Sequence, residues 1–180
     1  MDNAASHLET VGRVVKALTD VGFEPILVGG MALVIMGSQR VTKDFDFVIA
    51  HPHERLESIV DVFYDRGFEL ASRVNDAGEV THTIGNRRVA TSRIRLDGPA
   101  SVYFFNPKSR LRIDLLFDFP VAASTLEKRA TRTKIRSHVI CIASEADLLH
   151  LKRIVQAKRA APGDAQDIAF LEARARLDSP

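Results

Sequence analysis

The stretch that decides the fold runs from residue 25 to residue 49 and reads PILVGGMALVIMGSQRVTKDFDFVI. Its first half is a short apolar run that leads directly into Gly29 and Gly30. This pattern predicts a strand over residues 25–28, a glycine turn, and a helix over residues 31–36 that Gly37 ends. Because glycine lets backbone N–H groups approach a ligand closely, the turn is a candidate phosphate site, although a glycine pair after a strand is also a common plain turn.

The second half of the stretch predicts a strand over residues 44–50 with strictly alternating side chains. Phe45 and Phe47 fall on one face, and Asp44 and Asp46 fall on the other. A strand expected at residues 110–117 alternates in the same way, and Asp114 lies on its polar face together with arginines.

Three carboxylates on strand faces are a candidate metal site. Oxygen ligands at fixed separation suit one or two hard divalent cations, and Mg²⁺ is the natural occupant. The alternative is that these acids are solvent-facing residues of the kind that protects edge strands from aggregation.

Composition indicates an ordinary globular protein. The chain has 180 residues, of which 46% are hydrophobic and 27% charged, so we expect a single domain over residues 1–180 with residues 144–180 as a C-terminal helical extension. The single Cys141 excludes an internal disulfide and any Cys-rich zinc module. The longest apolar run, residues 31–36, is far shorter than the roughly 20 residues of a membrane span. Without a basic and apolar leader, a cytoplasmic protein is expected.

The remaining chain predicts an α/β (α+β) fold with a mixed, mostly antiparallel sheet, flanking helices and C-terminal helices. Helices are expected at residues 6–21, 52–67 and 144–159, with a last helix after Pro162-Gly163-Asp164. Between Phe68 and Phe119 we expect an antiparallel meander with strands at 79–84, 88–96, 101–105 and 110–117. Residues 120–137 are expected to form a loop or short helix, followed by a strand at 138–143.

The order Gly29-Gly30, Asp44-Phe45-Asp46 and a later lone Asp114 resembles the motif of the DNA polymerase β-like nucleotidyltransferase superfamily. The flanking pattern over residues 28–47 is similar to the branch of AbiEii-type toxins and small antibiotic nucleotidyltransferases, and so is the pairing of Lys152 with later aspartates. The likeness covers roughly residues 25–50, 110–118 and 144–172.

The resemblance implies a nucleotidyltransferase fold and transfer of a nucleoside monophosphate from an NTP to a hydroxyl of tRNA, a protein or a small antibiotic. Mg²⁺ in a two-metal site would be the cofactor. The implied catalytic and metal-binding residues are Asp44, Asp46 and Asp114. The implied nucleotide-binding residues are Gly29, Gly30, Ser38, Arg40, Lys43, Lys152 and Asp167, with Asp167 holding Lys152 by an ion pair.

Plainer interpretations stand beside each of these. Arg40 and Lys43 fit surface pairs with the neighbouring aspartates, and Lys152 borders an apolar stripe over which a lysine stem packs. Residues 87–180 hold 18 basic against 10 acidic side chains, which fits RNA contact or a solvated face. One alternative function is a non-catalytic nucleotide- or RNA-binding relative with an antitoxin partner. The other is an unrelated interaction domain.

Overall fold

The computed structural model describes residues 3–158 and 162–177. Its helices are α1 (Asn3–Asp20), α2 (Gly29–Ile35), α3 (Leu56–Tyr64), α4 (Arg87–Asp97), α5 (Ala123–Glu127), α6 (Glu145–Lys158) and α7 (Pro162–Leu177), with a 3₁₀ turn at His53–Arg55. Its strands are β1 (Ile26–Val28), β2 (Phe45–Ile49), β3 (Glu69–Val74), β4 (Val80–Ile84), β5 (Ser101–Phe105), β6 (Arg112–Phe117), β7 (Thr131–Ile135) and β8 (His138–Ile142).

One sheet carries all eight strands of the described chain, in the order β4-β3-β5-β6-β2-β1-β8-β7. β2 runs parallel to β6 and β1 runs parallel to β8, whereas the other five neighbouring pairs are antiparallel. The expected α+β class with a mixed, mostly antiparallel sheet is therefore confirmed.

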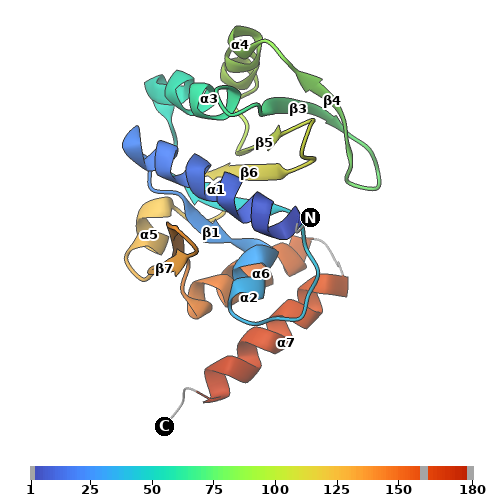
Figure 1. The fold of residues 1–180 in the computed structure, drawn as a ribbon. Helices are drawn as coiled ribbons and strands as arrows, with labels where there is room; N and C mark the ends of the chain where they lie inside the picture. The colour runs from blue at the N-terminus through green and yellow to red at the C-terminus, as the bar shows by residue number, and fades with distance from the viewer. Residues whose placement is uncertain (1–2, 159–161, 178–180) are drawn as a thin grey trace.

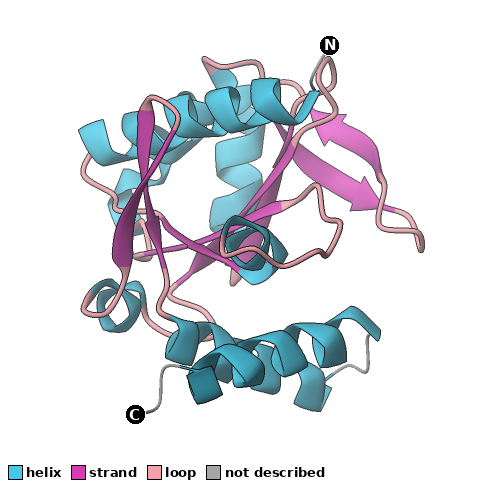
Figure 2. Ribbon diagram, turned by 60° about the horizontal axis from the view of Figure 1, so that its bottom comes forward, coloured by secondary structure: helices cyan, strands magenta, loops and turns pink. Residues whose placement is uncertain are grey.

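The helices lie at opposite ends and faces of the sheet. Figure 1 shows α3 and α4 at one end of the molecule and α6 and α7 at the other, and Figure 2 shows the C-terminal helix pair on the side of the sheet away from α1. No helix within residues 3–158 and 162–177 combines the length and the apolar character that crossing a bilayer requires.

The alternation of β2 and β6 is what fills the core. Phe45, Phe47, Ile113 and Leu115 are almost fully buried and point to one face of the sheet. The intervening positions of the same strands point to the opposite face. The core therefore fixes which face receives the acidic residues.

One expected strand is wrong. Residues 88–96 belong to α4, a helix that begins at the cap Asn86, whose side chain accepts hydrogen bonds from the backbone N–H groups of Arg88 and Val89. The helix ends at Gly98 in the left-handed conformation, φ 52°. Asn and Gly are typical of turns, which fits a strand between Asn86 and Gly98, but here they are the two caps of a helix. Ala90 and Ile94, four residues apart, are its buried contacts.

α4 also replaces the expected simple meander, because the chain leaves β4, forms this helix and returns on the other side of β3 as β5. In residues 120–137 the expected short helix is present as α5, but the second half is the strand β7, which pairs with β8. Its alternate residues are exposed and basic, so the hydrophobic signal of a strand is weak there. The predicted end of α6 near Arg159 lies outside the described residues.

Candidate active site

The glycine turn joins β1 to α2 and allows two close approaches of side chains to the backbone. Gly29 has φ +70°, and a Cβ atom on it would lie 2.2 Å from Oδ2 of Asp46. A Cβ atom on Gly30 would lie 2.8 Å from Nε of Arg40. Any larger residue at either position would displace a charged side chain that the sequence places in the site. Gly29 is therefore required by its positive φ as well as by this contact, whereas at Gly30 the flexible end of Arg40 could move aside.

Two of the three predicted carboxylates stand side by side. Asp46 on β2 is in register with Asp114 on the parallel neighbour β6, so their side chains project from the same face of the sheet. Asp44 precedes β2 by one residue and is exposed, and its charge acts on both of the other aspartates. Asp46 and Asp114, far apart in sequence, thus meet beside the Gly29 turn, and Asp44 lies close enough for its charge to act on both.

Crowding and burial change the acidity of this group. Burial, and after it the charge of Asp44, raise the pKa of Asp46 above its ordinary value of 3.8. Burial also raises the pKa of Asp114 to about 7, against the opposing hydrogen bonds from Arg112 and with the neighbouring charge of Asp46 adding to the increase. Each carboxylate makes ionisation of the other less favourable. A bound cation would relieve this repulsion.

Arg112 already supplies one cation to the site. Its Nε donates to Oδ1 of Asp114 at 2.7 Å and its Nη2 donates to Oδ2 at 2.8 Å. The guanidinium lies over the ring of Tyr103, 4.2 Å from the centroid, and its Nη1 donates to the carbonyl of Gly78 at 3.3 Å. Both oxygens of Asp114 are therefore in use.

The donor set fits Mg²⁺ in chemistry. All the donors are carboxylate oxygens, the kind that hard divalent cations prefer. In the part of the chain that the structure describes, no three acidic, His or Cys side chains are arranged so that they could hold a metal ion as they stand. Arg112 explains part of this, because its guanidinium holds both oxygens of Asp114 and competes with a metal ion for them.

A buried charge cluster lies on the other side of the glycine turn. Lys152 on α6 contacts Asp167 on α7 at 2.6 Å and Asp164 at 3.4 Å. Arg40 forms an ion pair with the same oxygen of Asp167, whose side chain is only 1% exposed. Both Lys152 and Arg40 lie close enough to Asp46 to lower its pKa. The predicted Lys152–Asp167 pair is therefore present, and Arg40 joins it.

The two other predicted nucleotide-binding residues are less engaged. Ser38 accepts a hydrogen bond from the backbone N–H of Arg40 at 3.3 Å, so it shapes the loop that carries Arg40. Lys43 is exposed and forms no hydrogen bond or ion pair with any described residue. The structure does not bring Lys43 to the cluster.

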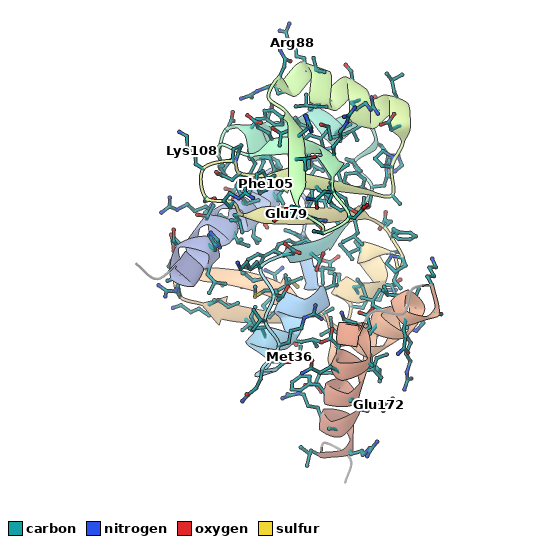
Figure 3. The ribbon with its side chains drawn as sticks, turned by 90° about the vertical axis from the view of Figure 1, so that its right-hand side faces the viewer. Met36, Glu79, Arg88, Phe105, Lys108 and Glu172 are labelled. Carbon is teal, nitrogen blue, oxygen red and sulfur yellow. The ribbon has the colours of Figure 1, made fainter. Side chains whose placement is uncertain are left out.

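Several basic side chains in the half of the chain considered for RNA contact form ion pairs. Arg87 pairs with Asp61 and Asp65, and on the same helix Arg93 pairs with Asp97. Exposed pairs of this kind are ordinary on solvated faces. In Figure 3, Arg88 projects away from the body of the protein at the outer end of α4. The pairing favours the solvated-face interpretation.

Comparison with known proteins supports the fold. No family model matches the chain, and no curated protein matches by sequence. Among solved structures, ANT(2″)-Ia in complex with adenylyl-2″-tobramycin has a TM-score of 0.59 at 10% identity, covering 92% of this chain and 87% of that one. The lincosamide antibiotic adenylyltransferase LnuA, lincomycin-bound, has a TM-score of 0.56 at 13% identity, covering 91% of this chain and 95% of that one. A nucleotidyltransferase-like protein from Paracoccidioides brasiliensis has a TM-score of 0.57 at 17% identity, covering 90% of this chain and 74% of that one. The chain has the nucleotidyltransferase fold.

Proposed function

We propose that this protein is a magnesium-dependent nucleotidyltransferase that moves a nucleoside monophosphate from an NTP to a hydroxyl of an acceptor. The observation that carries the proposal is the registered pair Asp46 and Asp114, which lies on one face beside the Gly29 turn. The fold shared with the antibiotic adenylyltransferases supports the reaction class. The AbiEii-type branch is inferred from the sequence motif alone.

Mg²⁺ held by Asp44, Asp46 and Asp114 would neutralise charge on the triphosphate and on the attacking and leaving oxygens. Residues of this chain around the metal would bind and orient the triphosphate. Gly29 and Gly30 let the side chains of Asp46 and Arg40 approach the backbone of the turn closely. Arg40 and Lys152, whose charges act on Asp46, would contact the triphosphate. Asp167 forms ion pairs with both Arg40 and Lys152 and so fixes their positions.

The transfer step forms one bond and breaks one. The hydroxyl oxygen of the acceptor attacks the α-phosphorus in line, and the bond from the α-phosphorus to the bridging oxygen of the leaving pyrophosphate breaks. The hydroxyl proton passes to a carboxylate oxygen of Asp114, once Arg112 has released it. Pyrophosphate leaves with the electron pair of the broken bond, and Arg40 and Lys152 would balance part of its negative charge.

The test is transfer of label from each of the four α-labelled NTPs, with Mg²⁺, to pools of tRNA, protein and small hydroxylated antibiotics. Asp46→Asn should abolish labelling and leave the fold intact. Asp76→Asn is the matched control, because it makes the same chemical change at an exposed residue of the β3–β4 turn and should label normally. Unaltered transfer by Asp46→Asn would refute the metal assignment.

The alternative function is a regulatory relative that binds nucleotide without transferring it, with an antitoxin as partner. The contact of Arg112 with both oxygens of Asp114 supports this alternative, because it competes with metal binding by that carboxylate. The two functions differ in one readout. Both kinds of protein would gain thermal stability from magnesium ATP, but only the enzyme would release pyrophosphate when an acceptor is present.

A further inference from the structure

A cavity opens where two neighbouring strands of the sheet separate. β3 and β5 form only two residue pairs, the last of them Leu70–Phe104, although β3 continues to Val74 and β5 starts at Ser101. Register shifts in the β3–β4 hairpin accompany this separation. The space between the strands measures about 400 Å³, within the range of about 300–1,000 Å³ that is typical of small-molecule sites.

Residues from both faces of the sheet line the cavity. Val102 and Tyr103 are consecutive on β5 and both line it, although consecutive strand residues point to opposite faces. Its inner wall is apolar and comes from Leu70, Ile94 and Val102, all about 5% exposed. An apolar wall of this depth suits the ring or hydrocarbon body of a small molecule.

The outer end of the cavity lies one strand away from the carboxylates. Tyr103 on β5 is in register with Asp114 on β6, and neighbouring strands are about 4.8 Å apart. Arg112 connects the two sides, because its guanidinium lies over the Tyr103 ring and holds Asp114. The Gly78 carbonyl, at the turn of the β3–β4 hairpin, contacts the same guanidinium. A molecule seated beside Tyr103 would therefore present its outer end toward Asp114.

The charges at the rim are unequal. Arg93 pairs with Asp97 at 2.6 Å, whereas Arg73 is exposed and forms no ion pair with the described residues. The rim therefore carries one uncompensated positive charge. It disfavours a cationic molecule and favours a neutral or anionic one.

We propose that the cavity between β3 and β5 is the acceptor site, and that the acceptor is a small neutral or anionic molecule with an apolar or aromatic body and a hydroxyl group. The role of acceptor rests on the proposed nucleotidyltransferase function. Binding of a small molecule in the cavity can be measured without any nucleotide. This proposal separates this chain from a nucleotidyltransferase whose acceptor is a polyamine.

The experiment uses three probes that share one phenol ring and differ in charge: 4-hydroxyphenylacetate, 4-hydroxyphenylacetamide and tyramine. Each is titrated to millimolar concentration into ¹⁵N-labelled full-length protein without NTP or Mg²⁺. The amide signals of Ala71, Ser101 and Tyr103 should shift with the first two probes, and tyramine should bind several-fold more weakly. Absence of shifts at these amides with all three probes would overturn the proposal, and so would a preference for tyramine.

Two variants and their controls test the place and the charge. Ala71→Phe fills the cavity and should abolish the shifts, whereas Val139→Phe, at an exposed position of β8, should leave them unchanged. Arg73→Glu should reverse the order of the charged probes, and Arg88→Glu, outside the cavity on α4, should preserve it. Because Arg73 is on the surface, this second variant decides the matter even if Ala71→Phe does not fold. Retained binding by Ala71→Phe, or an unchanged order with Arg73→Glu, would reject the cavity.

The outcome is distinguishable from failure of the proposed function. Asp46→Asn removes a residue of the phosphate side and should bind the probes normally. If the probes bind but no label is ever transferred, the cavity stands and the nucleotidyltransferase assignment fails. If label is transferred and Ala71→Phe transfers it equally well, the cavity is not the acceptor site.

Discussion

Substitution of Gly29 by alanine tests the site at its most crowded atom. Gly29 has φ +70°, and a Cβ atom there would lie 2.2 Å from Oδ2 of Asp46, a separation at which one of the two groups must move. The left-handed conformation alone costs an alanine about 1–2 kcal/mol. Forcing the Asp46 side chain away from its rotamer adds about 1 kcal/mol. We therefore expect Gly29→Ala to lower the free energy of unfolding by about 2–3 kcal/mol.

Gly67→Ala is the matched control. Gly67 has φ +77°, and its nearest non-local atom, Nδ2 of Asn106, would be 3.5 Å from the new Cβ, which is ordinary contact. This variant should therefore carry the backbone cost of about 1–2 kcal/mol alone. The difference between the two variants isolates the overlap with Asp46.

The assay is urea unfolding followed by far-ultraviolet circular dichroism, with the linear extrapolation applied to both variants. Mn²⁺ binding, followed by its electron paramagnetic resonance signal, is measured in parallel. Gly29→Ala should bind Mn²⁺ far more weakly than Gly67→Ala does, because Asp46 no longer points into the site. Equal unfolding free energies together with equal Mn²⁺ affinities would refute the placement of Asp46 against the turn.

Three further predictions test the charges. Arg112→Gln should destabilise the metal-free protein by about 3 kcal/mol, since it leaves Asp114 buried without its guanidinium, and Mg²⁺ should restore more of its melting temperature than it adds to the unmodified protein; no difference in the Mg²⁺ response would contradict the proposed competition. Lys152→Met should weaken magnesium ATP binding and lower stability, because it leaves Asp167 without its lysine. Adding Asp167→Leu should recover stability but not binding. Recovery of both would mean that the Lys152–Asp167 pair has only a structural role. At Asp147, burial acts to raise the pKa, but hydrogen bonds from an arginine and a serine outweigh it and lower the pKa below 3.8; its contribution is therefore present above about pH 4 and is lost as pH falls, and Asp147→Asn should flatten the acid side of the stability profile in urea titrations.

The sequence was sufficient where chemistry follows local periodicity. Alternation over residues 44–50 and 110–117 predicted that Asp46 and Asp114 would lie on the polar faces of their strands, and the structure places them in register. Glycine spacing predicted the turn. These features depend on neighbours along the chain, so one strand can be interpreted without knowing its partner.

Features that depend on tertiary pairing were not predictable. Arg40 and Asp167 are 127 residues apart, and nothing near either residue indicates the other. Arg112 shares the polar face of Asp114, which alternation did predict, but the two-point contact between them and the stacking on Tyr103 required the positions of β5 and β6. The alternation identified a neighbour of the carboxylate and could not give its orientation.

The error at residues 88–96 has a different physical origin. Asn86 and Gly98 are turn formers and helix caps for the same reason: a side chain that accepts from nearby N–H groups, and a backbone that adopts positive φ. The run between them contains β-branched and basic residues, so its propensity is weak in either direction. Burial of Ala90 and Ile94 at helical spacing decides the outcome, and burial comes from packing.

The arrangement of cations explains why the acids tolerate one another. Burial and neighbouring negative charge raise the pKa of Asp46 and of Asp114, and two groups of basic side chains lie close enough to oppose this increase. Arg112 comes from the sheet itself, on the side of the cavity, whereas Arg40 and Lys152 come from the other side and are held by Asp167. Since Asp167 belongs to α7, the last helix fixes the cations over the glycine turn. A site whose motif residues all precede residue 115 therefore depends for its electrostatics on the C-terminal helices.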